Sequence, residues 1–227
     1  MCGRISQDPS AKDLARLFQA ELLPDGKPEL GARYNVAPTQ PVLAVVEDEG
    51  KRLIVQHRWG LIPSWAKDPT AFDGKTHNAR AETVASKPAY RESFRRRRSL
   101  VPASAFYEWR RWDGSRQPYA IVRRDGLPLA LAGLWSSWRD PKSGRELLTC
   151  AMITTEANEV VGEIHDRMPV ILTEDAWDLW LDPKVRDVAA LETLLRPCPS
   201  DLIRAYPVSR AVGNTRNEGP ELLRAVA

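Results

Sequence analysis

The sequence predicts an α+β protein with a curved, mainly antiparallel β-sheet or barrel core that is flanked by short helices. Strand patterns follow one another through the middle of the chain, separated by turn signals such as "DGS", "RDG" and "PKSG" and not by helices. The helical patterns are short and lie outside this series. Without a composition break, internal repeat or low-complexity linker, the chain is expected to form a single domain over residues 1–227.

The first elements are a helix and a hairpin. Apolar residues recur at helical spacing over residues 10–22, and Ser10 with Asp13 forms a capping-box pair at the start of this segment. Two strands are predicted over 41–47 and 52–59, joined at "DEG". Two short helical patterns follow, "AETVASKP" and "AYRESFRRR", separated by a proline.

The central strands are predicted in the segments "SLVPASAFYEWRR", "QPYAIVRR", "LPLALAGLWSSW" and "ELLTCAMITT". Three short helices are predicted after them, in "EANEVVGEI", "TEDAWDLWL" and "VRDVAALETLLR". A final strand, "LIRAYPVS", leads into a segment rich in glycine and asparagine.

Composition and charge narrow the possible classes. Of the 227 residues, 43% are hydrophobic and 28% are charged, which is typical of a globular protein. No apolar run approaches the roughly 20 residues of a membrane span, and the start lacks a secretory signal pattern, so we expect a cytoplasmic protein without a membrane partner. Arginine outnumbers lysine 25 to 8, which hints at an anionic partner but also fits codon bias. A monomer is the default expectation.

The three cysteines are few and widely spaced, which argues against both a disulfide framework and a zinc site. Cys150 reads as a packed strand residue and Cys198 as a loop residue. Cys2 is different, because removal of Met1 would leave it with a thiol and a free α-amine on one residue. The alternative is a small side chain buried in an N-terminal strand. No metal or organic cofactor is indicated.

Three further polar residues stand inside strongly patterned segments: Asn78 in a loop, Glu108 in an aromatic strand, and His165 before an apolar strand. Each has a structural alternative: Asn78 could cap a helix, Glu108 could face solvent, and His165 could hold a backbone carbonyl. Together with a terminal Cys2 they fit aldehyde chemistry. An amine of pKa about 7.7–8.0 forms an imine, and the thiol then closes a five-membered thiazolidine ring. A carboxyl group, a histidine and an amide would assist these steps.

Seven motifs extend this hypothesis over nearly the whole chain. "MCGR", "RYNVAP", "WGLIPSWA", "NARAET", "FYEW", "IHDRMPVIL" and "PVSRAVGN" occur in the order seen in the SOS-response-associated peptidase family, which the sequence resembles from residue 2 to residue 217. The resemblance implies a protein that senses and shields abasic sites in single-stranded DNA by crosslinking itself to them. It also implies release of Met1 and reversal of the crosslink.

The resemblance assigns roles residue by residue. Cys2 would form the thiazolidine with the ring-opened sugar, Asn78 would hold the amine, Glu108 would carry protons, and His165 would assist ring opening. Arg4 and Arg80 would bind phosphate. The residues implied to line the DNA groove or to stack on its bases are Asn35, Pro38, Trp65, Trp109, Thr154 and Arg167.

Three other functions compete with this one. Glutamine amidotransferases also begin with a processed "MCG", but they carry a second, larger domain that 227 residues cannot hold. A thiol peptidase could pair Cys2 with His165 as nucleophile and base. A DNA-binding module without catalysis would leave the cysteine incidental, and it would bind equally well after Cys2→Ala.

Overall fold

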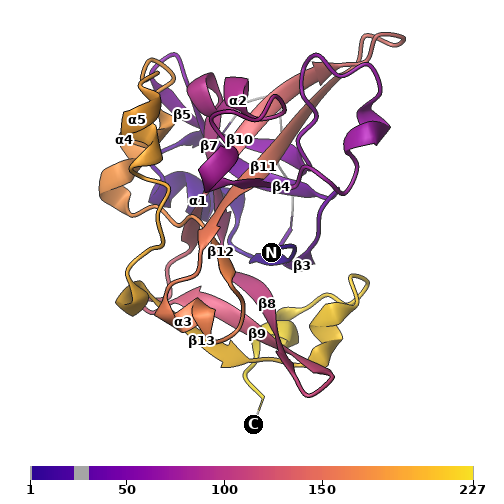
Figure 1. Ribbon diagram of the computed structural model, residues 1–227, viewed down its shortest axis with the longest axis vertical. Helices are drawn as coiled ribbons and strands as arrows, with labels where there is room; N and C mark the ends of the chain where they lie inside the picture. Colours follow the sequence, from indigo (N-terminus) through magenta and orange to yellow (C-terminus); the bar gives the residue numbers. More distant parts are fainter. Residues whose placement is uncertain (1, 23–30, 227) are drawn as a thin grey trace.

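The computed structural model describes residues 2–22 and 31–226 and confirms the α+β class (Figure 1). Met1, whose removal the terminal-cysteine hypothesis requires, lies outside the described residues. Within the described residues, the strands form two sheets, one with eight strands and one with five.

The larger sheet curls into a barrel. Its path runs through β12 (Arg167–Pro169), β11 (Glu146–Glu156), β10 (Leu129–Arg139), β7 (Arg98–Ala103), β4 (Pro41–Asp48), β5 (Lys51–Trp59) and β2 (Glu21–Leu22). A parallel pairing of β11 with β5, in the register Cys150 to Trp59, closes the five strands β4, β5, β7, β10 and β11 on themselves. The short β6 (Asn78–Arg80) also pairs with β11.

The smaller sheet has the order β13 (Ile203–Pro207), β9 (Ser115–Arg123), β8 (Ala105–Trp112), β1 (Ile5–Gln7) and β3 (Arg33–Val36). The buried side chain of Gln7 joins the two sheets: its Nε2 donates to Leu43 O (3.0 Å) and Pro102 O (2.7 Å), and its Oε1 accepts from Leu43 N–H (2.7 Å). The first strand of the chain is thereby fixed against the barrel.

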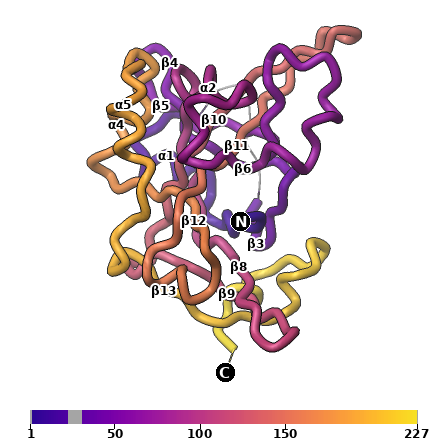
Figure 2. Tube along the Cα trace, viewed as in Figure 1, coloured from indigo at the N-terminus to yellow at the C-terminus, as the bar shows by residue number. Residues whose placement is uncertain are grey.

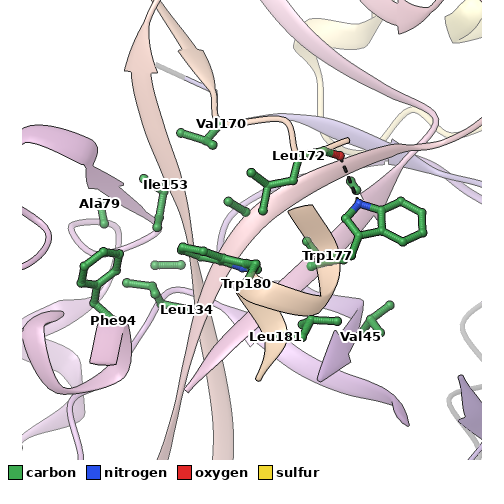
Figure 3. Close-up of a cluster of buried hydrophobic side chains, with 14 of the residues drawn as sticks. Val45, Ala79, Phe94, Leu134, Ile153, Val170, Leu172, Trp177, Trp180 and Leu181 are labelled. Atoms are coloured by element: carbon green, nitrogen blue, oxygen red, sulfur yellow. Dashed lines mark hydrogen bonds between the residues drawn. The ribbon is translucent and has the colours of Figure 1, made fainter. Parts of the chain in front are cut away.

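Short helices cover one side of the barrel. They are α1 (Ala11–Leu17), α2 (Arg91–Arg96), α4 (Trp177–Leu181) and α5 (Val188–Glu192), while α3 (Glu159–Gly162) lies near β13. Figure 2 shows α4 and α5 on one side of the trace and β8, β9 and β13 at the lower end. Trp180 is fully buried, near Leu134 and Phe94 in the largest apolar cluster (Figure 3). Trp177 donates its indole N–H to Leu172 O at 3.1 Å.

Several sequence predictions need correction. The helix predicted over 10–22 begins after its Ser10 cap but ends at Leu17, because Gln19 takes a left-handed conformation with φ 52°. The segment "SLVPASAFYEWRR" is two strands in different sheets, because Ser104 N–H bonds to Ser6 O (2.9 Å) where the chain crosses from the barrel. Asn78, predicted in a loop, lies in β6.

The other predicted strands and the hairpin at 41–59 are confirmed. The late helices exist but are shorter than predicted, and "AETVASKP" forms only a 3₁₀ turn at Ala81–Thr83. Among the described residues, no helix has the length and apolar character needed to cross a membrane.

Candidate functional site around Cys2

Cys2 is held where the two sheets meet. The chain enters β1 at Ile5, which pairs with Phe106 of β8, and Arg4 O accepts a hydrogen bond from Tyr107 N–H at 2.9 Å. Cys2 is fully buried, in the apolar cluster that includes Trp59 and Met152 of the barrel side. Of the alternative expectation, a small side chain buried in an N-terminal strand, the burial is confirmed but the strand is not, because β1 begins only at Ile5.

Asn78 contacts the cysteine directly. Its Nδ2 donates to Cys2 O at 2.6 Å, and Asn78 O accepts from the Tyr90 hydroxyl at 3.0 Å. The pairing of Asn78 with Met152 in the β6–β11 ladder fixes the backbone that presents this amide. Asn78 Oδ1 is buried and has no hydrogen-bond partner among residues 2–22 and 31–226, so it is available to a donor.

Glu108 is buried in β8 with 3% of its surface exposed, so the solvent-facing alternative is wrong. Burial raises the pKa of the Glu108 carboxyl to about 7, and the nearby charge of Asp166 adds to this. Burial, and after it the Glu108 carboxylate, raises the pKa of the Cys2 thiol far above its usual range. The thiol is therefore neutral at rest, and a carboxyl that can carry a proton near neutral pH lies within electrostatic range.

A cavity of about 610 Å³ opens beside these groups. Residues 108–112 of β8 with Arg116 form one wall, and residues 163–166 form the other. His165 is on the second wall, where its Nδ1 accepts from Arg167 N–H at 3.0 Å and lies 2.8 Å from Asp166 Oδ1. Burial lowers the pKa of His165, so its imidazole is neutral at pH 7. Glu108 and His165 thus face one cavity.

Arg4 is anchored beside the cysteine. Its Nη1 donates to Asn35 Oδ1 and to Val212 O, both at 2.7 Å, and its guanidinium carbon lies 5.9 Å from the Trp109 ring centre. Asn35 is fully buried and donates to Asn214 O and to Asn217 O, both at 2.9 Å. Arg4 Nε is buried and, within the described part of the chain, has no partner.

Arg167 is occupied by protein groups. It forms a two-pronged ion pair with Glu82, and its Nη2 also donates to Thr154 O at 2.7 Å. The hydrogen bonds from Arg167 lower the pKa of Glu82. Thr154 is fully buried, with its hydroxyl 3.4 Å from Ala79 O. The groove-lining roles of Arg167 and Thr154 therefore remain predictions, since their side chains contact the protein here.

The remaining predicted residues lie at or near the surface. Trp65 is 61% exposed and meets Phe72 edge to face at 5.8 Å, Arg80 is exposed, and Pro38 is half-buried. The structure gathers Cys2, Asn78, Glu108 and His165, together with Arg4 and Trp109, but it brings neither Trp65 nor Arg80 into the walls described above.

Sequence reasoning missed several neighbours of the site. Tyr90 and Glu82 hold Asn78 and Arg167, and "RRW" at 110–112 with Arg116 lines the cavity. Glu82 had a signal, because it belongs to "NARAET", but its partner is 85 residues away. In the described part of the chain, no group of three or more His, Cys, Asp or Glu side chains could hold a metal ion.

The fold and this site define a class of protein: an α+β chain with a barrel, a second sheet, and a cysteine near the start that is buried between them. A family model described as SOS response associated peptidase (SRAP) matches residues 1–215, and the chain belongs to this family.

Two relatives and one solved structure agree. The abasic site processing protein YoqW of Bacillus subtilis is 41% identical over 227 residues, covering 99% of this chain and 100% of YoqW. The abasic site processing protein YedK of Escherichia coli is 31% identical and covers 100% of both chains. A crystal structure of a protein from Bacteroides thetaiotaomicron superposes with a TM-score of 0.91 at 27% identity, over all of both chains. The sequence resemblance and the fold class are thus confirmed.

Proposed function

We propose that this protein recognises abasic sites in single-stranded DNA and links itself to them covalently through Cys2 after loss of Met1. The names of YoqW and YedK support DNA with abasic sites as the substrate. The observation that carries the proposal is the placement of Cys2, which lies against Asn78 Nδ2 and next to the buried Glu108 carboxyl. We further propose a monomer that acts in the cytoplasm.

The first step is imine formation. The neutral α-amine of Cys2 attacks the aldehyde carbon of the ring-opened deoxyribose, and water leaves from the resulting carbinolamine. Ring opening needs a proton moved between sugar oxygens, for which the neutral imidazole of His165 is suited. A Glu108 carboxyl with pKa about 7 is half protonated near neutral pH, so it can protonate the departing hydroxyl. Asn78 Oδ1, buried and available, can accept from the amine.

The second step is ring closure. The Cys2 sulfur bonds to the carbon of the protonated imine, the carbon–nitrogen double bond becomes single, and the ring nitrogen keeps the proton it already carries. The thiol starts neutral because burial raises its pKa, so it must lose its proton as the carbon–sulfur bond forms. The Glu108 carboxylate left by the first step is the nearby base for this transfer. The same groups acting in reverse would open the ring again.

The environment of the thiol favours this proposal over a thiol peptidase. A peptidase needs a thiolate, which requires a lowered thiol pKa, whereas burial and Glu108 raise the pKa of Cys2. A thiol that attacks second, on an electrophilic imine already tethered to the same residue, needs no such activation because the ring closure is intramolecular.

A denaturing gel tests the covalent step. Protein with a free Cys2 terminus, verified by mass spectrometry, is mixed with a single-stranded oligonucleotide carrying one abasic site. We expect a heat-stable shifted band that is absent with undamaged DNA. Cys2→Ser keeps the amine and loses the thiol, so it should give a band only after borohydride reduces the imine. Cys198→Ala, at a buried cysteine elsewhere, should crosslink like wild type. Absence of the wild-type band would contradict the proposal.

Salt dependence tests the arginine roles separately. Release of counterions predicts that affinity for single-stranded DNA falls with a logarithmic slope of about −0.7 per phosphate contact. A flat response between low and high salt would remove Arg4 and Arg80 from the proposed phosphate contacts.

A further inference from the structure

The β8–β9 hairpin projects beyond the site already described. Its tip is a two-residue turn, Asp113–Gly114, in which both residues have positive φ (45° and 73°), the geometry that matches the twist of paired strands. Trp112 pairs with Ser115 across the turn, and Ser115 Oγ donates to Trp112 O at 2.8 Å. The strands of the hairpin therefore stay paired up to the turn, which places Trp112 at the tip.

Trp112 is the most exposed large apolar side chain of the described residues, at 67%. It follows Glu108 and Arg110 at alternate positions of β8, so the three side chains share one face of the strand. The Arg110 guanidinium carbon lies 5.3 Å from the Trp112 ring centre. An exposed indole beside a cation is the combination that binds nucleobases by stacking.

Two arginines lie opposite each other on the other face of the hairpin from Trp112. Arg111 and Arg116 are direct cross-strand partners, and like charges in that position destabilise a sheet. Neither forms an ion pair with a carboxylate of the described residues. Both line the 610 Å³ cavity, and Arg116 continues with Trp109 and Arg210 into a second cavity of 410 Å³. An anion bound between Arg111 and Arg116 would relieve their repulsion.

The cavity wall formed by residues 163–166 limits the path that a DNA strand can take. Glu163 and Asp166 lie on that wall and disfavour phosphate there. A polyanion leaving the lesion is therefore expected to follow the arginine wall of the hairpin. Trp112 is four positions after Glu108, which is roughly 13 Å along a strand at about 3.3 Å per residue. This exceeds the ~3.4 Å step of stacked nucleotides, so Trp112 meets a base a few nucleotides from the lesion.

We propose that the β8–β9 hairpin is a second DNA-binding element, in which Trp112 stacks on a base of the flanking strand and Arg111 with Arg116 binds its phosphates. The inference rests on the proposed function for the position of the lesion. It assigns the hairpin to the flank on one side of the lesion only, because the hairpin leaves the site in one direction. Figure 1 shows it at the lower end of the molecule, opposite the tip of the β10–β11 hairpin.

The test uses DNA that cannot be crosslinked. Single-stranded oligonucleotides carry a tetrahydrofuran abasic analogue, which has no aldehyde, either in the centre, at the 5′ end or at the 3′ end. Fluorescence anisotropy gives the dissociation constants. Trp112→Ala should weaken binding about 5–100-fold for the central analogue and for one end-placed analogue, and leave the other unchanged. Trp112→Phe should retain most of the affinity.

The arginines have their own readout. The double variant Arg111→Ser with Arg116→Ser should weaken binding of the same two oligonucleotides and reduce the salt slope by about 1.4, for two lost phosphate contacts. Arg139→Ser is the matched control, because Arg139 is an exposed strand arginine near the tip of the distant β10–β11 hairpin. It should bind like wild type.

Two results would overturn the inference: Trp112→Ala binding all three oligonucleotides like wild type, or losing affinity equally for both end-placed analogues. Thermal unfolding of each variant confirms that the fold is kept. A failure of the proposed function gives a different pattern. Wild-type protein would then show no heat-stable band with an aldehyde-bearing site, while the dependence of tetrahydrofuran binding on Trp112 would persist.

Discussion

Polar groups are buried both on the helix-covered side of the barrel and on the cysteine side, but the two sides differ in how these groups are hydrogen-bonded. Arg98, on the helix side, is 2% exposed, and its guanidinium donates to four backbone carbonyls: Phe94, Trp180, Asp182 and Val185. Burial lowers the pKa of Arg98 to about 10, so it is still charged at pH 7. Its donors end the short helix α4 and join it to β7.

On the cysteine side, the buried polar atoms are left partly unused. Arg4 Nε, Asn78 Oδ1 and Arg167 Nε have no hydrogen-bond partner within the described residues. Glu108 is buried at a pKa of about 7, which means that the fold raises the free energy of its charged form. Buried polar atoms without partners cost free energy; they occur elsewhere in the described chain too, at Ser99 Oγ of β7 for example, but three of them belong to residues of the candidate site.

The largest effect should come from breaking the helix side. Trp180→Ala leaves a cavity in the largest apolar cluster and frees Ser99 O, to which the indole N–H donates at 2.9 Å. We expect a loss of about 3–5 kcal/mol in the free energy of unfolding. Urea denaturation measures it. Trp112→Ala, at an exposed site, is the control and should change stability by less than about 0.5 kcal/mol.

Arg98→Met should have the second-largest effect on the free energy of unfolding. The substitution removes the charge and leaves four buried carbonyls without the donors that Arg98 provides. We therefore expect a loss of about 2–4 kcal/mol in the free energy of unfolding. Arg98→Lys restores part of the donors and should recover part of the loss. Crosslinking measured well below the melting temperature should be unchanged in both variants; a loss of crosslinking there would mean that the two regions are coupled.

Glu108→Gln should separate the stability of the cysteine side from its activity, because it slows crosslinking and raises the free energy of unfolding. We expect crosslink formation to slow about 100-fold or more, as for loss of a general acid–base group. The Glu108 pKa is raised in the folded state from 4.5 to about 7, so the native protein binds more protons and wild-type stability falls as pH rises through this window. The variant lacks this loss.

The expected gain for Glu108→Gln is about 1–3 kcal/mol at pH 8 and little at pH 4. Melting temperatures across pH 4–8 measure it. The crosslinking rate of the wild type should itself peak near neutral pH, because the α-amine must be neutral and Glu108 must be protonated. Equal stability of variant and wild type at pH 8 would contradict the assigned pKa.

The smallest effect concerns how His165 is positioned. Arg167 N–H donates to His165 Nδ1, and Glu82 holds the Arg167 guanidinium. Glu82→Gln keeps the size but loses the ion pair, which is partly exposed and contributes about 0.2–1 kcal/mol. We expect a two- to fivefold slower crosslink and a shifted upper limb of the pH–rate profile. Glu156→Gln, at an exposed carboxylate of β11, should have no effect.

Much of the fold was predictable from local pattern. The capped start of α1, the hairpin of β4 and β5, and the long strands β10 and β11 all follow from periodicity and turn residues. The segment from Ser99 to Arg111 misled, because two strands separated only by Ser104 look like one when pairing partners are unknown. The short β6 was missed because three residues carry no period, and only its pairing with β11 makes it a strand.

The sequence by itself determined the class of fold through local periodicity and the family through seven ordered motifs, and the family resemblance then named the candidate residues around Cys2. Only the tertiary structure decided which arginines are free. Arg98 follows three other arginines in the sequence but is buried among carbonyls, and Arg167 is held by Glu82. Arg111 and Arg116 instead face each other without carboxylate partners in the described chain. Burial and pairing depend on contacts between distant segments, and those contacts also set the pKa of Glu108.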